Sequence, residues 1–271
     1  MEKKLNEFYA ELDSWYAYQN FDAVEHFLLD ELREHGNECF TCHNPIAVTV
    51  LNELGSLYRY LGRQKEAIEM FEAAAKALET RGRANTEEFA SAVNNLSEVY
   101  RMDGQFEKAI INAQRALAIF EKCVGKKSYP YSSALNNLGL AYLKKAEGEK
   151  AKDIFLEAIN ILEQSPSHVN YYMGDMAVTL CNLAAVYLME NALDKAKEYT
   201  DKALACFSHL SHGEMYHISS VYNMIGDIYR MEQDNRNALK AYKQAMEWIN
   251  RYYGKNFEYQ KLENKVKCLF E

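Results

Sequence analysis

A repeated pattern with a period of about 42 residues is the strongest constraint on how this chain folds. A large apolar marker residue recurs in steps of 42, 42, 45 and 42 residues. The markers are Leu54, Leu96, Leu138, Leu183 and Ile225. Ala, Leu, Glu, Lys and Tyr fill the copies with few breakers, which favours helices. A fixed period made of two helical segments predicts a solenoid, in which each unit packs on its neighbours.

Each copy has the same skeleton of large and small residues. In the third copy, the marker Leu138 is followed by Gly139 and Tyr142, and later by Ala151 and Ala158. The small residues allow two helices to approach closely, while the large residues fill the space between the helices. The skeleton therefore predicts a pair of packed helices in every copy.

This pattern resembles the tetratricopeptide repeat. The spacing of 42 residues and the string L-N-N-L-G at 135–139 are more similar to the kinesin light chain branch than to the form of about 34 residues. The resemblance extends over about residues 45–250. It implies an all-α fold: a right-handed α-solenoid of about six helical hairpins with a C-terminal capping helix.

We predict a single superhelical domain over residues 1–271. Residues 1–40 are expected to form a degenerate first hairpin, because Leu5, Phe8, Leu12 and Trp15 follow helical spacing. Residues 45–252 hold the five clear repeats. Residues 255–271 are predicted to form an amphipathic helix that covers the exposed face of the last repeat.

Composition and charge favour a soluble folded protein and argue against nucleic-acid binding. Asp and Glu outnumber Lys and Arg by 39 to 31, and no basic run is present, so nucleic acid is not an expected partner. The apolar runs are too short to span a membrane. No secretion signal is recognisable, so we expect a cytoplasmic protein whose six cysteines are free thiols.

The resemblance implies a ligand site in a concave groove lined by the first helix of each hairpin. The marker and its tyrosine pack inward, so positions on another stripe of the same helix are expected to face the groove. The ligand would be a protein or an extended peptide. The candidate groove residues are Asn52, Arg59, Asn94, Asn95, Glu98, Arg101, Asn136, Asn137, Lys144, Asn182, Asn223, Asp227 and Arg230.

Three asparagines stand immediately before a marker residue. These are Asn95, Asn137 and Asn182. Asparagine is a mediocre residue inside a helix, and its amide matches the C=O and N–H groups of an extended peptide. The resemblance implies that these three residues hold a peptide backbone. The alternative is that they bond to neighbouring helices and stabilise the superhelix.

Basic residues occupy equivalent positions in adjacent copies. Arg59 and Arg101, with Lys144 nearby, would form a basic strip that favours a carboxylate on the ligand. The alternative is that these side chains pair with Glu53 or Glu98 inside the groove. The sequence leaves the two interpretations open.

The sequence holds no catalytic motif that we recognise, and we expect neither an enzyme nor a cofactor. The string C-F-T-C-H at Cys39, Cys42 and His43 matches a c-type haem pattern, but it lies at a repeat boundary. Zinc binding, a redox-sensitive pair and ordinary thiols are the alternatives for these residues. The segment 209–217 holds three histidines and Glu214, which are metal-ligating residue types. It lies in an expected linker, where a polar turn is the alternative interpretation.

The leading functional prediction is a non-catalytic scaffold that holds an extended peptide or partner segment in the groove. The first alternative is a ligand-responsive signalling adaptor or sensor, of the type that bacteria use to detect peptides. A remote alternative is a metal- or haem-binding protein that uses Cys39, Cys42 and His43. The sequence does not fix the oligomeric state.

Overall fold

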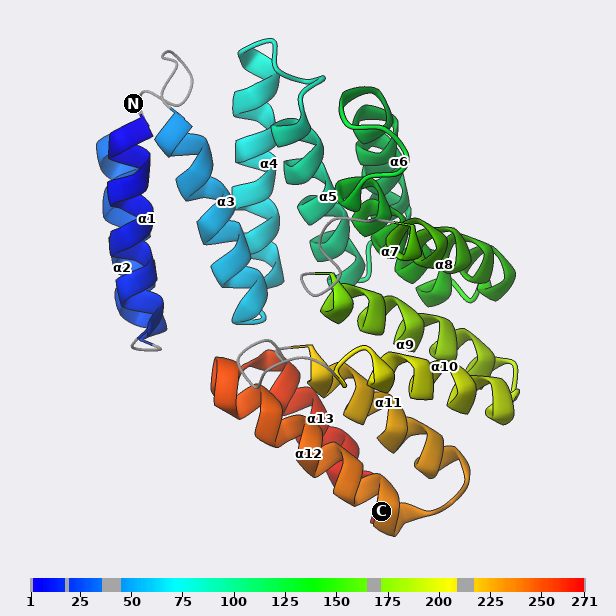
Figure 1. The fold of residues 1–271 in the computed structure, drawn as a ribbon. Coiled ribbons are helices and arrows are strands. Elements are labelled where there is room, and N and C mark those ends of the chain that lie inside the picture. The colour runs from blue at the N-terminus through cyan, green and yellow to red at the C-terminus, as the bar shows by residue number, and fades with distance from the viewer. Residues whose placement is uncertain (1, 18–19, 36–44, 165–171, 209–216, 271) are drawn as a thin grey trace. The chain divides into compact units, whose positions relative to one another are not determined.

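The structure, a computed structural model, describes residues 2–17, 20–35, 45–164, 172–208 and 217–270. These ranges form thirteen helices and no strand (Figure 1). The prediction of an all-α fold built from helical hairpins is therefore confirmed. No helix within these ranges has the length and the apolar character that a membrane-spanning helix needs.

The helices divide into two compact units, residues 1–119 and 120–271. In the first unit, α2 packs on α1 and on α3, and α4 packs on α3 and on α5 (Figure 1). The helices of the first unit are α1 (Glu2–Ala17), α2 (Phe21–His35), α3 (Pro45–Tyr60), α4 (Gln64–Thr80), α5 (Glu87–Met102) and most of α6 (Phe106–Cys123). The prediction of one domain over 1–271 stays a prediction.

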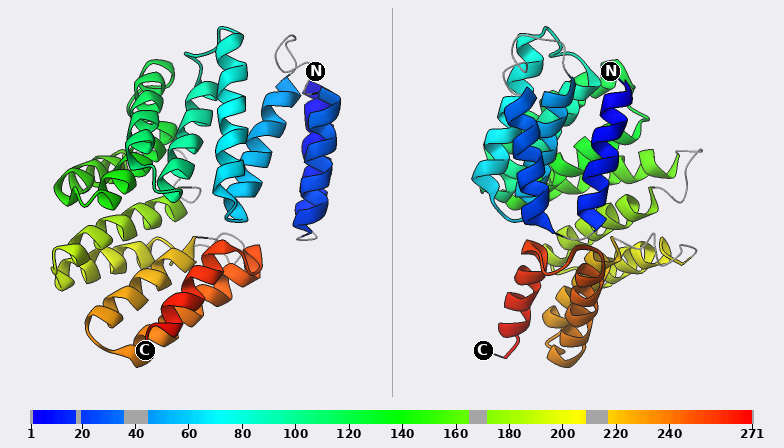
Figure 2. Two further views of the ribbon diagram at one scale, coloured as in Figure 1. Left: turned by 180° about the vertical axis from the view of Figure 1, so that it is seen from behind. Right: turned by 90° about the vertical axis from the view of Figure 1, so that its left-hand side faces the viewer.

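The second unit repeats the same packing with the remaining helices. Each second helix packs on the first helix of its own hairpin, and first helices of consecutive hairpins also touch (Figure 2). The helices are α7 (Tyr129–Lys144), α8 (Gly148–Glu163), α9 (Met173–Met189), α10 (Leu193–Ala205), α11 (Ile218–Met231), α12 (Asn235–Tyr253) and α13 (Phe257–Lys267).

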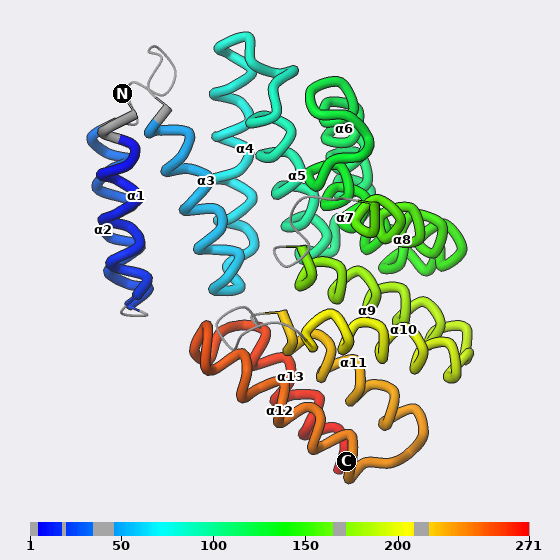
Figure 3. Tube along the Cα trace, viewed as in Figure 1, coloured from blue at the N-terminus to red at the C-terminus, as the bar shows by residue number. Residues whose placement is uncertain are grey.

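A turn joins the two helices of each clear hairpin (Figure 3). Every one of these turns uses one residue in the left-handed conformation, eight residues after the marker. These residues are Gly62, Gly104, Ala146, Asn191 and Gln233, with φ between 56° and 81°. The N–H of the next residue donates to the carbonyl of the repeat tyrosine, as Glu147 does to Tyr142 at 3.0 Å. This bond satisfies a carbonyl that the helix end leaves open.

Helix contact inside a hairpin depends on a small residue directly after the marker. A Cβ added at Gly139 would lie 2.6 Å from Cε1 of Phe155, which stands 16 residues later. The same pairing joins Gly55 to Phe71 and Gly226 to Tyr242. Only a residue without a side chain lets the aromatic ring lie against the helix backbone.

Two hairpins use a different combination at the same two positions. Ser97 faces Ala113 by repeat position, and Ala184 faces Thr200. Ser97 and Thr200 are buried, and each donates its hydroxyl to a backbone carbonyl, at 2.8 Å in both cases. The aromatic ring is therefore replaced by a small side chain where its partner is no longer glycine, which avoids a steric clash between the two helices.

Ionic and hydroxyl contacts tie consecutive hairpins together in the first unit. The hydroxyl of Tyr58 donates to Glu25 at 3.0 Å, and Arg63 donates to the other oxygen of Glu25 at 2.8 Å. One repeat later, the hydroxyl of Tyr100 donates to Glu72. The repeat tyrosine thus anchors each first helix to the second helix of the preceding hairpin.

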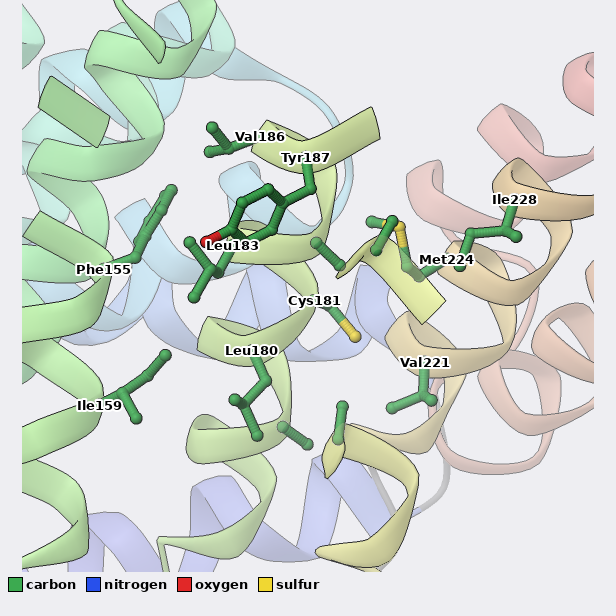
Figure 4. Close-up of a cluster of buried hydrophobic side chains, with 14 of the residues drawn as sticks. Phe155, Ile159, Leu180, Cys181, Leu183, Val186, Tyr187, Val221, Met224 and Ile228 are labelled. Atoms are coloured by element: carbon green, nitrogen blue, oxygen red, sulfur yellow. The ribbon is translucent and has the colours of Figure 1, made fainter. Parts of the chain in front are cut away.

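The core of the second unit is continuous across α7 to α11 (Figure 4). Phe155 and Ile159 of α8 face Leu183 and Leu180 of α9 on one side, and Met224 of α11 approaches α9 from the other. Burial of these side chains contributes about 1.5–3 kcal/mol for each large apolar group. No hairpin of this unit completes its core alone, as a repeat fold requires.

The last helix, α13, lies on α12 (Figure 2). Leu262 and Leu269 are 5% and 6% exposed in the cluster that includes Tyr242 and Ile249 of α12. The amide of Asn235 donates to the carbonyl of Leu269 at 2.9 Å. The C-terminal helix therefore covers the last hairpin, as the sequence predicts.

We predict that Gly139→Ala lowers the free energy of unfolding by about 1–2 kcal/mol, because the new methyl group overpacks the contact with Phe155. Urea denaturation followed by circular dichroism measures the change. Gly148→Ala is the matched control, since its Cβ would meet only Val186, at an ordinary 3.8 Å. Equal effects of the two substitutions would contradict the steric explanation.

Candidate functional site

In the first unit, the two predicted basic residues share one carboxylate. A terminal nitrogen of Arg59 on α3 donates to Glu98 on α5, and Nη2 of Arg101 lies 4.0 Å from the other oxygen of Glu98. The side chain of Glu98 is 28% exposed. Arg59 therefore pairs with Glu98, another candidate groove residue. This pairing is the alternative to ligand binding that the sequence left open.

The predicted asparagines of the first unit differ in burial. Asn94 is 7% exposed, whereas Asn52 and Asn95 are half-buried. The side-chain oxygen of Asn52 is buried, and no donor reaches it from the described residues. An acceptor without a donor costs free energy, so Asn52 is the member of this set with an unused hydrogen-bonding group.

A cluster of carboxylates and tyrosines lies between α1 and α3. Burial, and then the charge of Asp13, raise the pKa of Glu53. Burial, and then the charge of Glu53, raise the pKa of Tyr16 to about 12, and the same two causes raise the pKa of Tyr9. The sequence analysis did not find this cluster, because α1 carries no recognisable repeat marker that would align it with α3.

In the second unit, two predicted asparagines bond to each other. Nδ2 of Asn182 on α9 donates to Oδ1 of Asn136 on α7 at 2.9 Å. Each amide keeps one polar group that this bond does not use. Asn137 is half-buried beside Asn136, and Lys144 is exposed at the end of α7. At Asn182 the structure thus contains the helix-to-helix bond that is the alternative to ligand binding.

The predicted residues of the last hairpin bind the C-terminal helix. Nζ of Lys265 on α13 lies 2.7 Å from Oδ1 of Asn223 and 2.7 Å from both carboxylate oxygens of Asp227. The hydroxyl of Tyr242 also donates to Asp227 at 2.7 Å. Arg230 is exposed. Lys265 could not be predicted from the sequence, because a helical period does not indicate which residue of a capping helix contacts the preceding hairpin.

A small pocket, open to solvent and lined by both polar and apolar side chains, lies between α7, α8 and α9. The hydroxyl of Tyr129 donates to Oδ2 of Asp175 at 2.9 Å, and the Tyr129 ring stacks on Tyr172 at 4.3 Å. Asn136 is the one predicted groove residue in its lining. The rest of the pocket lies one to two helical turns before the positions that the repeat alignment selected.

The histidine that follows this pocket is His217, at the start of α11. Its Nε2 lies 3.8 Å from Oδ1 of Asp175. Burial lowers the pKa of His217, and the charge of Asp175 opposes that shift. Burial therefore favours the neutral imidazole of His217 at pH 7.

Metal binding finds no support in the part of the chain that the structure describes. That part contains no group of three or more His, Cys, Asp or Glu side chains that would hold a metal ion. Cys39, Cys42, His43 and the segment 209–216 lie outside the described residues. Cys181 is buried, and burial raises the pKa of the Cys206 thiol to about 11, so these two thiols are poor nucleophiles.

The sequence matches two family models, both described as tetratricopeptide repeat. One model matches residues 88–164, and the other matches residues 48–77 and 219–252. Together these segments cover just over half of the chain. No curated protein sequence matches the chain.

Solved structures with a similar fold include the following three. The first is NprR in complex with its cognate peptide NprX, with a TM-score of 0.71, 14% identity, and coverage of 98% of this chain and 73% of that chain. BtubC (BKLC) from P. vanneervenii has a TM-score of 0.62 at 23% identity, with coverages of 74% and 79%. A putative kinesin light chain from Podosopora anserina has a TM-score of 0.56 at 16% identity, with coverage of 77% of this chain and 98% of that chain.

We predict that Glu53→Gln raises the melting temperature at pH 7–8. Since burial raises the pKa of Glu53 in the fold, ionisation of this group costs stability at neutral pH. The cost is absent below the unfolded pKa of about 4.3, so the gain should vanish there. Thermal unfolding at several pH values measures it, with the exposed Glu69→Gln as control. A wild type more stable than Glu53→Gln at pH 7 would refute the prediction.

Proposed function

Because the chain belongs to the tetratricopeptide repeat superfamily, we propose that it is a non-catalytic scaffold that binds a protein or peptide partner. The partner contacts the first helices of the hairpins, and an extended segment is the form that fits a row of side chains repeated along the chain. The concave groove that these first helices would line is expected from the resemblance to tetratricopeptide repeats.

The observation that carries this proposal is the run of asparagines on the first helices. Asn95, Asn137 and Asn182 are all half-buried, and each immediately precedes a marker residue. In the second unit the bond between Asn182 and Asn136 holds both amides in place and leaves each with a further hydrogen-bonding group. An amide held in this way binds a peptide group with little loss of side-chain entropy.

The comparison with NprR supports a peptide as the partner. That protein is in complex with its cognate peptide, and its fold is similar to 98% of this chain. Hydrogen bonds to a backbone supply about 1 kcal/mol each, so side-chain contacts must provide the specificity.

We predict that Asn95→Ala, Asn137→Ala and Asn182→Ala each weaken peptide binding about 5- to 30-fold, since each removes one or two hydrogen bonds of about 1 kcal/mol. A peptide selected by display on the full chain serves as the ligand, and isothermal titration calorimetry measures the affinity.

Asn160→Ala is the matched control, because Asn160 is an exposed asparagine on a second helix, α8. Its substitution should leave the affinity unchanged. Circular dichroism checks that every variant folds. Wild-type affinity in all three groove variants, with the fold intact, would disprove the asparagine contacts.

A ligand-responsive sensor is the second candidate, and the similarity to peptide-bound NprR over nearly the whole chain favours it. A sensor changes conformation when its ligand binds, whereas a static scaffold does not. If the chain is a sensor, small-angle scattering with saturating peptide will show a radius of gyration that differs from that of the free protein. An unchanged radius would leave the scaffold as the function.

A further inference from the structure

Several hydroxyl and carboxylate groups in the pocket between α7, α8 and α9 present hydrogen-bond acceptors. The hydroxyl of Ser132 donates to the carbonyl of Tyr129 at 2.8 Å, and the hydroxyl of Thr179 donates to the carbonyl of Asp175 at 2.9 Å. Both side chains are 2% exposed, so these bonds are shielded from water. Because each hydroxyl has one proton, both oxygens offer only lone pairs to the pocket.

The same accounting applies to the tyrosine and the carboxylate. The Tyr129 hydroxyl donates its proton to Asp175, and the ionised carboxylate of Asp175 can only accept hydrogen bonds. Oδ1 of Asn136 accepts one bond from Asn182 and has a second lone pair, while the Asn136 amino group and the Ser133 hydroxyl can donate. Asp175 is the only formal charge in the lining, which contains neither Lys nor Arg. A group that donates several hydrogen bonds and carries a positive charge complements this set.

The chain already contains one such arrangement, in the last hairpin. The Lys265 ammonium lies 2.7 Å from Asn223 and from Asp227, and 5.4 Å from the centre of the Tyr242 ring. Asn223 and Asn136 occupy the same repeat position, two residues before the marker. The pocket thus repeats the combination of asparagine, aspartate and tyrosine.

The apolar part of the lining fits the stem of a long basic side chain. Leu162 of α8 and Val178 of α9 face the pocket beside the polar groups. Lysine and arginine bury their methylene groups on apolar surface while the charged end reaches polar partners. A short amine would leave this apolar surface uncovered.

We propose that this pocket binds the ammonium or guanidinium group of a lysine or arginine side chain of the partner segment. The proposal rests on the scaffold function for the source of that side chain. Asp175 supplies the charge, Asn136, Ser132, Thr179 and Tyr129 supply acceptors, and Leu162 and Val178 contact the stem. The pocket then selects partners that carry a basic residue.

The first test titrates the full chain with the Nα-acetyl, N-methylamide derivatives of lysine, arginine and norleucine. Methyl resonances of Leu162 and Val178 report binding. The lysine and arginine derivatives should shift these resonances with dissociation constants in the millimolar range, which corresponds to a binding free energy of about −4 kcal/mol. The norleucine derivative should not shift them. No shift with either basic derivative, or an equal shift with norleucine, would overturn the proposal.

Asp175→Asn should weaken binding of the basic derivatives at least about tenfold, because it removes the charge and keeps the shape. Asp201→Asn, an exposed carboxylate on α10, is the charge-matched control and should bind as wild type does. Thr179→Val keeps Asp175 and should weaken binding about threefold, so the test does not depend on one variant. Full binding by folded Asp175→Asn would refute the role of its charge.

The second test uses peptides selected by display on the full chain. Selected peptides should contain Lys or Arg, and replacing that residue with norleucine should weaken wild-type binding about tenfold but leave Asp175→Asn binding unchanged. Peptides that bind without a basic residue would overturn this proposal and leave the scaffold standing. If no peptide binds while the lysine derivative does, the pocket is an amine site and the scaffold is refuted.

Discussion

The turn inside each hairpin is the constraint on which the rest of the structure depends. Its left-handed residue sits eight positions after the marker in all five clear copies, whether it is Gly62 or Ala146. The turn fixes the register between the two helices, so the residue after the marker always faces the residue 16 positions later. The stripe of the first helix that packs inward, and therefore the stripe that carries the asparagines, follows from that register.

Much of the fold follows from the sequence alone, because the period records it directly. The repeat tyrosines and the glycines after the markers were recognisable, and each makes a contact that recurs in the structure. The turns were less predictable. Glycine indicates a left-handed residue at Gly62 and Gly104, and asparagine tolerates it at Asn191, but nothing in the residue type indicates it at Ala146 or Gln233.

The candidate sites were predictable as positions but not as partnerships. The alignment places Arg59 and Glu98 near the groove, yet their mutual bond depends on side-chain reach between α3 and α5. Likewise, Asn223 binds Lys265, a residue outside every repeat. The pocket at Asp175 escaped prediction, because its character depends on which acceptors three hydroxyl groups bond to, and a sequence period does not contain that information.

The alternation of contacts inside the hairpins has a consequence for folding. A chain of similar helices risks pairing a first helix with the wrong second helix. Here such an exchange is penalised in both directions: Phe155 against Ala184 would clash, and Thr200 against Gly139 would leave a void. Neighbouring repeats thus differ at the contact between the residue after the marker and the residue 16 positions later. Intermediates with mispaired helices are therefore less stable than the native pairing.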